Sequence, residues 1–374
     1  MTALAETNSL KKTPLYDEHL SLGGKMAGFG GWLLPIYYTG IIAEHNATRQ
    51  SCGIFDVSHL GEIRVQGKGA FDFLQRRLTQ DLRKVKPGHI LYDLLLDEKG
   101  GIIDDILVCC ENSDDFYLIV NAANIDADLE ALSNSVPSSV TLKNQSDNAA
   151  CIAVQGPKSE AILEALFGFS LKNLAYYAFR EEVFLGEPVW VTRSGYTGED
   201  GFEIFSSPEL SVKIWRKFLS EGKSLGVTPA GLGARNTLRL EAGNLLCGGD
   251  MDRTTTPLEA GLGFAVSFDK EGGFFGDAVL REQKKNGVTR RMAAFKMLER
   301  SVAREHYKIF NSGKEIGMVT SGSFAPTAGG NIGLGYVATG FEAPGTQIQI
   351  EIHGQLAKAQ IVKRPFVPLK HKKI

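Results

Sequence analysis

Toward its carboxyl end the chain follows a simple pattern of short apolar stretches, each followed by glycine, proline or asparagine. Within residues 288–367 these stretches are MAAFKM, EIGMVT, IGLGYVA, TQIQIEI and AKAQIVK. Short strand-like stretches divided by turn residues are typical of small antiparallel barrels. The pattern therefore predicts a separate small β-barrel over residues 288–367.

The remainder of the chain mixes strand and helix patterns. Its 374 residues exceed the roughly 250 to 300 residues that a single hydrophobic core serves, so we expect several compact units. Apolar stretches predict strands at 62–65, 90–96, 102–110 and 116–120. Helical spacing predicts helices at 70–82, 125–132, 161–166, 210–219 and 231–243. Together these patterns indicate the α+β class.

Charge and cysteine content exclude several classes of protein. The formal net charge of -2 and the pI of about 6.4 provide no general attraction to nucleic acid or an anionic membrane. No stretch approaches the roughly 18 uncharged apolar residues of a membrane span, and the amino-terminal residues hold no apolar signal core. Five cysteines without a C-x-x-C pair suit a reducing compartment. We expect a cytoplasmic protein with neither a nucleic-acid nor a membrane partner.

Two adjacent acids stand in the apolar stretch 102–110. Because side chains alternate along a strand, Asp104 and Asp105 should lie on opposite faces, and at least one should point inward or toward a cleft. A buried carboxylate needs a hydrogen-bonding partner or a ligand. Asp105 is therefore either a ligand-facing group or a strand-end carboxylate satisfied by backbone amides, and we interpret Asp104 as structural.

Two further segments allow both a binding and a structural interpretation. GYTGEDGFE at 195–203 has glycines that permit close approach of a ligand, or an ordinary hairpin in which Glu203 is a surface strand residue. Arg235 and Arg239 lie at i and i+4 of a predicted helix. There they either engage a carboxylate together or pair with Glu241 and other acids.

The sequence does not indicate a metal or nucleotide site. It has no H-E-x-x-H motif and no cluster of cysteine and histidine at ligand spacing, so we predict that no metal is bound. We interpret His59 as a satisfied, partly buried histidine. GLGARN at 231–236 lacks the third glycine of a dinucleotide fingerprint, and no Walker A or G-x-S-x-G motif occurs.

Eight short segments together carry a family resemblance. They are TPLYDEH at 13–19, FGGW at 29–32, FDVSH at 55–59, GGIIDD at 100–105, QGP at 155–157, GYTGEDGFE at 195–203, LRLEAG at 238–243 and VTSG at 319–322. From about residue 12 to 368 their order and spacing closely resemble the glycine cleavage T-protein (aminomethyltransferase) family. The resemblance implies a three-domain cloverleaf around a central folate pocket. Residues 12–265 would form two interleaved α+β domains of the folate-binding region, and the C-terminal barrel would be the third.

The resemblance also implies a reaction and a partner. The family transfers the methylene carbon of S-aminomethyl-dihydrolipoyl H-protein to tetrahydrofolate, releasing ammonia and forming 5,10-methylenetetrahydrofolate. Tetrahydrofolate would then be the co-substrate and lipoylated H-protein the partner. H-protein is acidic in the family, so the basic residues within 281–291 could steer it, although this segment equally suits a solvated linker face.

The resemblance gives roles to six residues by position. Asp105 matches the catalytic carboxylate beside the reacting region of tetrahydrofolate. Glu203 matches the acid that recognises the pteridine, whose adjacent N–H groups suit two acceptor oxygens, and Arg235 matches the arginine that meets the glutamyl tail. The other folate-pocket positions are Tyr92, Asn121 and Tyr196. The chain departs from the family at Cys109, where some members have a folate-side tyrosine.

Two other functions share this scaffold. One is a tetrahydrofolate-dependent demethylase, whose members resemble the SGYTGEDGFE and IIDD segments less closely. The other is a folate-binding regulatory protein. Relatives of that kind carry a K-G-C-Y-x-G-Q-E segment where this chain has SGYTGEDGFE, without cysteine. Oligomeric state and polyglutamate preference do not follow from the sequence.

Overall fold

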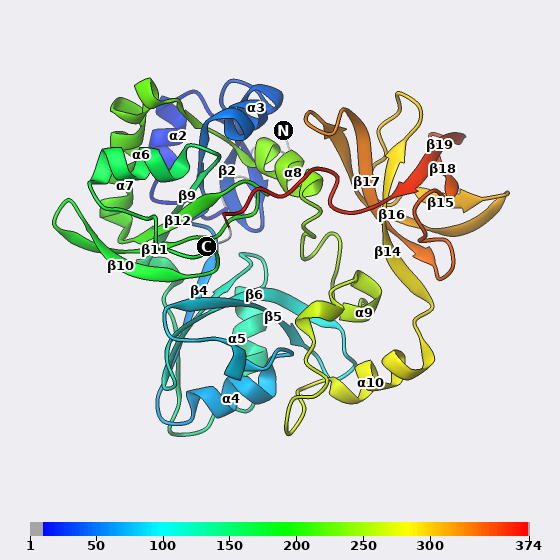
Figure 1. Cartoon of the computed structure of the whole chain (residues 1–374), viewed down its shortest axis with the longest axis horizontal. Helices are drawn as coiled ribbons and strands as arrows, with labels where there is room; N and C mark the ends of the chain where they lie inside the picture. The colour runs from blue at the N-terminus through cyan, green and yellow to red at the C-terminus, as the bar shows by residue number, and fades with distance from the viewer. Residues whose placement is uncertain (1–9, 373–374) are drawn as a thin grey trace.

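The molecule arranges three lobes around a shared centre (Figure 1). This computed structural model describes residues 10–372. Residues 1–9 and 373–374 lie outside the described part. The prediction that the amino-terminal residues hold no signal core therefore falls partly outside the described residues. One lobe is built on a six-stranded sheet, one on a five-stranded sheet, and the third is a closed barrel. The α+β class and the C-terminal barrel are therefore confirmed.

The first lobe carries a six-stranded sheet in the order β10-β11-β12-β9-β3-β13. The strands are β3 (Cys52–Asp56), β9 (Ala150–Gln155), β10 (Phe179–Phe184), β11 (Glu187–Thr192), β12 (Gly201–Ser206) and β13 (Val227–Pro229). The helices of this lobe are α2 (Tyr16–Ser21), α3 (Ile41–Gln50), α6 (Ser159–Phe167), α7 (Pro208–Ser220) and α8 (Leu232–Glu241). The hairpin of β1 (Lys25–Phe29) and β2 (Trp32–Tyr37) packs against α8.

The sequence of helix α7 explains where the helix begins and which of its faces is buried in this lobe. The Ser207 side chain accepts a hydrogen bond from the Leu210 amide at 3.2 Å, and Pro208 occupies the first turn, where no amide hydrogen is needed. Leu210, Ile214 and Phe218 follow at the four-residue spacing of one helix face, and all are fully buried. That face packs in the core beneath the six-stranded sheet.

The second lobe is a five-stranded antiparallel sheet in the order β5-β6-β7-β4-β8. Its strands are β4 (Gly61–Gln66), β5 (His89–Leu96), β6 (Ile102–Asn112), β7 (Asp115–Val120) and β8 (Thr141–Asn144). Helices α4 (Ala70–Arg77) and α5 (Ile125–Ser133) pack on one face. The predicted helix over 70–82 was too long, because Leu78 is already extended and bridges to Leu95 of β5.

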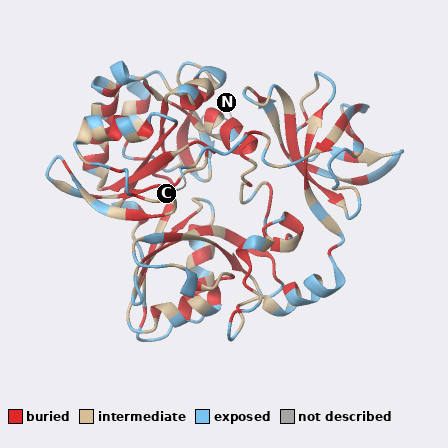
Figure 2. Ribbon diagram, in the orientation of Figure 1, coloured by how far each residue is buried: buried red, intermediate tan, exposed pale blue. Residues whose placement is uncertain are grey.

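The two sheets face each other across a shared apolar layer. The five-stranded sheet lies in sequence between β3 and β9, which are paired neighbours in the other sheet. Buried side chains of the layer are Phe55, Cys151 and Phe205 from the first sheet and Ile90, Cys109 and Ile119 from the second. Figure 2 shows the buried residues concentrated on the strands of both sheets. A polar side chain in this layer is therefore held by rigid strands.

The third lobe closes six strands in the order β14-β17-β16-β15-β18-β19, so that none has a free edge. They are β14 (Arg290–Met297), β15 (Lys308–Asn311), β16 (Lys314–Ala325), β17 (Gly330–Ala338), β18 (Gln347–Ile352) and β19 (Gln355–Val362). Strand β15 was not predicted, because its four residues are too few to show alternation.

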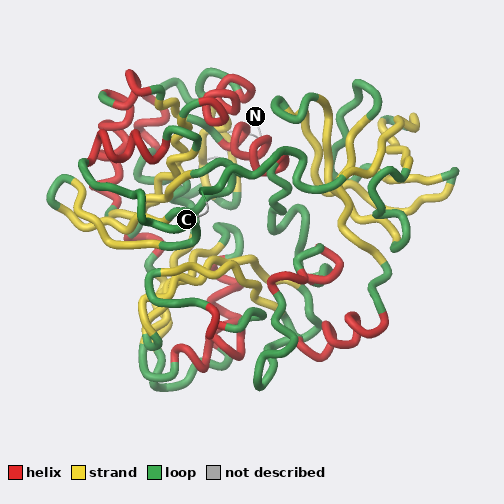
Figure 3. The backbone as a smooth tube through the Cα atoms, in the orientation of Figure 1, coloured by secondary structure: helices red, strands yellow, loops and turns green. Residues whose placement is uncertain are grey.

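Loops and short helices join the lobes (Figure 3). The helices between lobes are η2 (Ser146–Asn148), α9 (Pro257–Ala260), η4 (Gly263–Ala265) and α10 (Asp277–Asn286). Two further short helices lie inside lobes: η1 (Leu82–Lys84) in the second and η3 (Gly222–Leu225) in the first. The segment between α8 and α9 packs Leu245 and Met251 into a core shared with the barrel. Within residues 10–372 no helix is long and apolar enough to cross a membrane.

Candidate functional site

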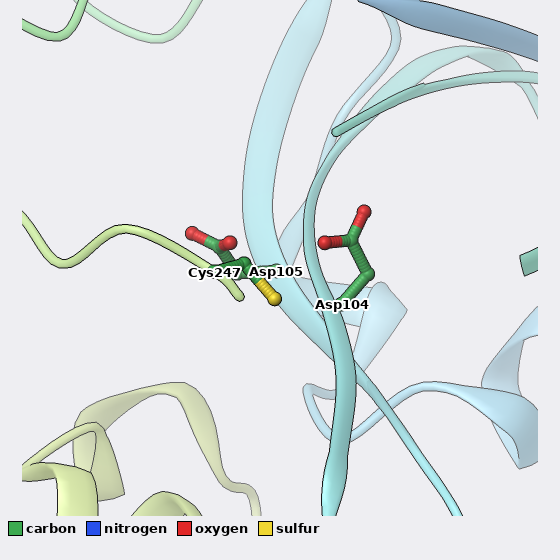
Figure 4. A group of neighbouring side chains, drawn as sticks. All are labelled: Asp104, Asp105 and Cys247. Carbon is green, nitrogen blue, oxygen red and sulfur yellow. The ribbon is translucent and has the colours of Figure 1, made fainter. Parts of the chain in front are cut away.

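The two adjacent acids of β6 lie on opposite sides of the strand, as alternation predicts (Figure 4). Asp105 pairs with Leu94 of β5, and Asp104 pairs with Leu95. The Asp104 side chain is fully buried beneath the five-stranded sheet, whereas Asp105 is partly exposed. The two neighbours therefore meet different surroundings although they share one strand.

The hydrogen bonds to the Asp105 carboxyl come from side chains. The Tyr92 hydroxyl donates to Oδ2 at 3.1 Å, and the Asn121 side-chain amide donates to Oδ1 at 3.0 Å. Burial, followed by the charge of Asp104, raises the pKa of Asp105 to about 7. Such a group is close to half protonated at neutral pH, so it can both accept and return a proton.

Amide donors surround the Asp104 carboxyl, and their hydrogen bonds oppose the rise in its pKa that burial causes. The Asn121 backbone amide donates to Oδ2 at 2.8 Å, and the side-chain amides of Asn121 and Asn124 donate to Oδ1 at 2.8 and 2.6 Å. Asn121 therefore contacts both acids, because the same amide nitrogen also reaches Asp105. This asparagine orients the two carboxyl groups relative to each other.

An aromatic pair lies beside Asp105. The Tyr92 ring stacks on the Phe264 ring, with centroids 5.9 Å apart and planes inclined by 23°. Phe264 is in η4 and is 70% exposed, so most of this large apolar side chain faces solvent. It provides an apolar surface next to the carboxyl group.

Glu203 is the second buried acid between the sheets. It lies on β12 opposite Thr192 of β11, and its carboxyl accepts a hydrogen bond from the Ser194 hydroxyl. Burial raises the pKa of Glu203, while the Ser194 hydrogen bond and the positive charge of Arg235 oppose the rise. The alternative that Glu203 is a surface strand residue is wrong.

Arg235 and Arg239 have different partners although both belong to α8. Within the described chain the Arg235 guanidinium makes no hydrogen bond, and it lies 4.6 Å from the centre of the Tyr196 ring. Arg239 is buried and pairs with Asp250 at 2.5 Å rather than with Glu241, which pairs with Arg49 at 2.9 Å. Arg235 is thus free to receive an anionic group, and Arg239 is not.

Tyr196 lies in the loop between β11 and β12. Its hydroxyl donates to the Leu245 carbonyl, and its ring lies under Arg235. The charges of Asp105 and Arg235 both act on the Tyr196 hydroxyl, and those of Glu203 and Asp105 both act on Tyr177. The structure therefore brings the six residues selected from sequence into one neighbourhood.

Four residues of this neighbourhood escaped the sequence reasoning. Tyr177 lies near both acids, Phe264 stacks on Tyr92, Cys247 lies beside Asp104 and Asp105, and Asp128 approaches Asp104 from α5. Only Asp128 carried a sequence signal, because an acid stands three residues after Ile125 and four before Leu132, on the apolar face of α5.

Cys247 forms a cluster with the two aspartates. One atom from each of Asp104, Asp105 and Cys247 lies within 4.8 Å of the others (Figure 4). The Cys247 thiol donates to the Ile103 carbonyl, and burial with the two nearby carboxylates raises its pKa. The oxygens of Asp104 already accept amide hydrogen bonds. The three side chains therefore engage in hydrogen bonds, and the Cys247 thiol keeps its proton.

His59 differs from its interpretation as a satisfied, partly buried histidine. It is only 2% exposed, and its Nδ1 has no hydrogen-bond partner among the described residues. Burial, followed by the positive charge of Arg235, lowers its pKa to about 4, so the ring is neutral. A neutral ring packed edge-on to Phe29 tolerates an unpaired nitrogen better than a charged one.

A cavity of about 470 Å³ opens between the two sheets on the β8 side of the five-stranded sheet. It is lined in part by Glu62, Cys109, Tyr117, Lys143 and Trp190. Burial raises the pKa of Glu62 to about 8. None of the six residues selected from sequence lines this cavity. Glu62 is therefore a second protonatable acid in the same layer, outside the group around Asp105.

Comparison with known proteins defines the class. Residues 15–270 match the model of the GCVT N-terminal domain, and residues 290–368 match the glycine cleavage T-protein C-terminal barrel domain. The aminomethyltransferases of Halothermothrix orenii and Bacillus subtilis are each 43% identical over 358 residues, covering 96% of this chain and 100% and 99% of theirs.

The fold agrees with these matches. The crystal structure of glycine cleavage system aminomethyltransferase T from Bartonella henselae has a TM-score of 0.92 at 34% identity, covering 98% of this chain and all of that chain. The chain is thus a two-part protein with a GCVT domain and its barrel. It belongs to the glycine cleavage T-protein (aminomethyltransferase) family, as the sequence motifs predicted.

Proposed function

We infer that this chain is the aminomethyltransferase of a glycine cleavage system. It moves the methylene carbon of S-aminomethyl-dihydrolipoyl H-protein to tetrahydrofolate, with release of ammonia and formation of 5,10-methylenetetrahydrofolate. Family membership over nearly the whole chain supports the reaction. The observation that carries the chemistry is Asp105, a carboxyl group with a pKa of about 7 held between Tyr92 and Asn121.

Asp105 accepts and returns a proton during the transfer. The two folate nitrogens that bind the methylene carbon each lose a proton, while the departing amine and the dihydrolipoyl sulfur each gain one. Asp105 accepts a proton from an attacking nitrogen, which raises its nucleophilicity, and returns it to a leaving group. Its negative charge also stabilises positive charge on the methylene carbon. Tyr92 and Asn121 hold the carboxyl in place during both steps.

The other selected residues bind the folate within the region 12–265. Glu203 accepts hydrogen bonds from adjacent N–H groups of the pteridine, because its two oxygens match that pair and Ser194 fixes its orientation. Arg235 binds the glutamyl carboxylate, which its unpaired guanidinium suits. Tyr92 and Asn121, which hold Asp105, and Tyr196, which lies under Arg235, contact the folate between these ends.

Lipoylated H-protein is the partner, and two lysines of α10 supply the steering charge. Arg281, Arg290 and Arg291 pair with acids of this chain at 2.8, 3.0 and 3.5 Å. Lys284 and Lys285, in the last turn of α10, form no such pair with any residue of the range 10–372. Reversing both to glutamate should raise the KM for an acidic H-protein several-fold at low salt and little at high salt. Equal kinetics at both salt concentrations would end this assignment.

The cytoplasm is the expected compartment. All five cysteines are free in the structure, four of them buried, which fits a reducing environment. The same scaffold supports tetrahydrofolate-dependent demethylation or folate-binding regulation, and these are the alternatives that an assay must separate.

The test is a reconstituted reaction of the purified chain with aminomethylated, lipoylated H-protein and tetrahydrofolate. Equal amounts of ammonia and 5,10-methylenetetrahydrofolate are expected. Tight folate binding without ammonia would instead favour the demethylase or the regulatory function. Formation of 5-methyltetrahydrofolate from a sulfonium or methoxy donor would then identify the demethylase.

A further inference from the structure

Gln155, the first residue of the QGP segment, is the last residue of β9. Its side chain is an uncharged amide that is only 1% exposed, and the proposed reaction does not use it. Strand β9 lies between β12 and β3 in the six-stranded sheet, and Gln155 is paired with Gly201 of β12. The amide therefore lies where the chain leaves the loop of residues 193–200 and enters β12.

Both ends of the Gln155 amide form hydrogen bonds with this loop and the residue that follows Gly201. Nε2 donates to the Ser194 carbonyl at 3.0 Å and to the Phe202 carbonyl at 3.3 Å. Oε1 accepts a hydrogen bond from the Thr197 hydroxyl at 2.8 Å. One buried side chain thus connects the start of the loop, its middle and the strand that follows it.

Two glycines leave the space that the Gln155 side chain occupies. A Cβ atom on Gly195 would lie 2.0 Å from Oε1, and one on Gly201 would lie 2.5 Å from Nε2. Atoms that are not bonded to each other do not approach so closely in a packed protein. Neither glycine has a left-handed backbone, so the Gln155 side chain, rather than the backbone conformation, excludes a side chain at both positions. The loop is built around this amide.

The same loop carries groups assigned to the folate. Ser194, whose carbonyl Gln155 holds, donates its hydroxyl to the Glu203 carboxyl. Tyr196 lies between the two loop residues that Gln155 contacts, and its ring lies under Arg235. A shift of the loop would therefore move the donor of Glu203 and the Tyr196 ring together.

We propose that Gln155 is a positioning residue for folate recognition. Its hydrogen bonds hold the Ser194 hydroxyl against Glu203 and keep the Tyr196 ring in place. The inference rests on the proposed function, because recognition of the pteridine by Glu203 is part of that function. Gln155 does not touch the folate in this scheme. Since Asp105 lies on the other sheet, loss of the Gln155 amide should weaken folate binding and preserve the chemical step.

Gln155→Met removes the three hydrogen bonds and keeps a side chain of similar length. The dissociation constant for tetrahydrofolate and its KM should both rise about tenfold, with kcat at saturation nearly preserved. Gln75→Met is the matched control, because Gln75 donates from its side chain to Asp81 at 2.9 Å but belongs to α4 of the second lobe. This control should leave both quantities unchanged.

Two results would overturn the positioning role. One is an unchanged dissociation constant for tetrahydrofolate in Gln155→Met. The other is a fall in kcat at unchanged KM, which is what a smaller folded fraction would produce. If Gln155→Met does not fold, Thr197→Val replaces it, because it removes the hydrogen bond to Oε1 alone among those of Gln155. The dissociation constant should then rise by a smaller factor, and an unchanged value would again overturn the role.

A double-mutant cycle tests whether the loop is built around Gln155. Gly195→Ala places a methyl group 2.0 Å from Oε1, so it should weaken folate binding as strongly as Gln155→Met does. In a chain that carries Gln155→Ala this space is empty, so Gly195→Ala should add little further loss. Additive losses would show that the two residues act independently and would contradict the proposal.

Hydrogen exchange of backbone amides tests the structural step without folate or turnover. The amides of residues 195–201 should exchange faster in Gln155→Met, whereas those of α7 should keep the rates of the unmodified chain. Arg193 still pairs with Asp200 across the ends of the loop, so the loop should loosen without unfolding. Unchanged exchange within 195–201 would contradict the proposal.

The two kinds of measurement distinguish this proposal from the proposed function. If Gln155→Met shows faster exchange and weaker folate binding but the unmodified chain transfers no aminomethyl carbon, the function is refuted and the positioning role stands. If the unmodified chain transfers the carbon and Gln155→Met binds folate normally, only the positioning role is refuted.

Discussion

Asp105, which is partly exposed, and Glu203, which is buried, are acids on the two facing sheets, yet their neighbours differ in sign. Burial raises the pKa of both groups. Asp104 adds a negative charge beside Asp105, whereas Arg235 and the Ser194 hydroxyl stabilise the anion of Glu203. The comparison teaches that neighbouring charge separates the roles of two carboxyl groups in one apolar layer. Asp105 is suited to exchange a proton, and Glu203 is suited to remain an acceptor.

The largest effect is expected from Asp105→Asn. The amide preserves shape but cannot take a proton, so kcat should fall about 10²- to 10⁴-fold while folate affinity changes little. Steady-state kinetics and folate titration measure the two quantities. Glu62→Gln is the matched control, since it alters another buried acid with a raised pKa in the same layer. Full turnover by Asp105→Asn would remove the catalytic assignment.

Glu203→Gln should change KM and leave kcat nearly unchanged, whereas Asp105→Asn changes kcat. The amide loses one acceptor oxygen toward the pteridine, so the KM for tetrahydrofolate should rise about 10- to 100-fold, with kcat at saturation nearly preserved. The same kinetic series measures this effect. A fall in kcat at unchanged KM would show that the two acids do not have separate roles.

Arg235→Gln removes the positive charge that stabilises the anion of Glu203. Loss of the glutamyl contact should raise the KM for tetrahydrofolate about tenfold. Without the cation the pKa of Glu203 rises further, so affinity should also weaken as the pH is lowered. Folate titration at several pH values checks both parts, and a loss of affinity that is independent of pH would contradict the second.

The smallest effect concerns stability. An acid whose pKa is raised in the folded state destabilises that state as pH increases from its unfolded pKa, about 4, toward its folded pKa, about 7 for Asp105. Asp105→Asn should therefore raise Tm by a few degrees at pH 8 and leave it unchanged at pH 4. Glu203→Gln should raise Tm less, because Arg235 already offsets part of the penalty. Thermal unfolding at both pH values decides this, and equal shifts at pH 4 and pH 8 would contradict it.

The sequence predicted those features that depend on local periodicity. The barrel followed from short strands and turns, and the opposite faces of Asp104 and Asp105 followed from strand alternation. The end of α4 was misplaced because Leu78 fits a helical apolar pattern but pairs with Leu95 across the sheet. Local patterns therefore identified the elements better than their ends.

Contacts between distant segments explain what the sequence missed. One of the two alternatives paired Arg239 with Glu241 and other acids, and its partner is Asp250, which lies in the segment between α8 and α9. Tyr177, Cys247 and Phe264 reach the acids from separate loops, and no spacing rule connects them to β6. The roles of the six selected residues stay predictions until variants are measured.

The pH dependence of the single-turnover rate tests the role of Asp105 most directly. The unmodified chain and Glu203→Gln, each saturated with tetrahydrofolate and aminomethylated H-protein, should show a rate that rises with pH around a midpoint near 7, because the carboxylate form of Asp105 accepts the proton. In Asp105→Asn the residual rate should lack this midpoint. The same midpoint in Asp105→Asn would show that another group exchanges the proton.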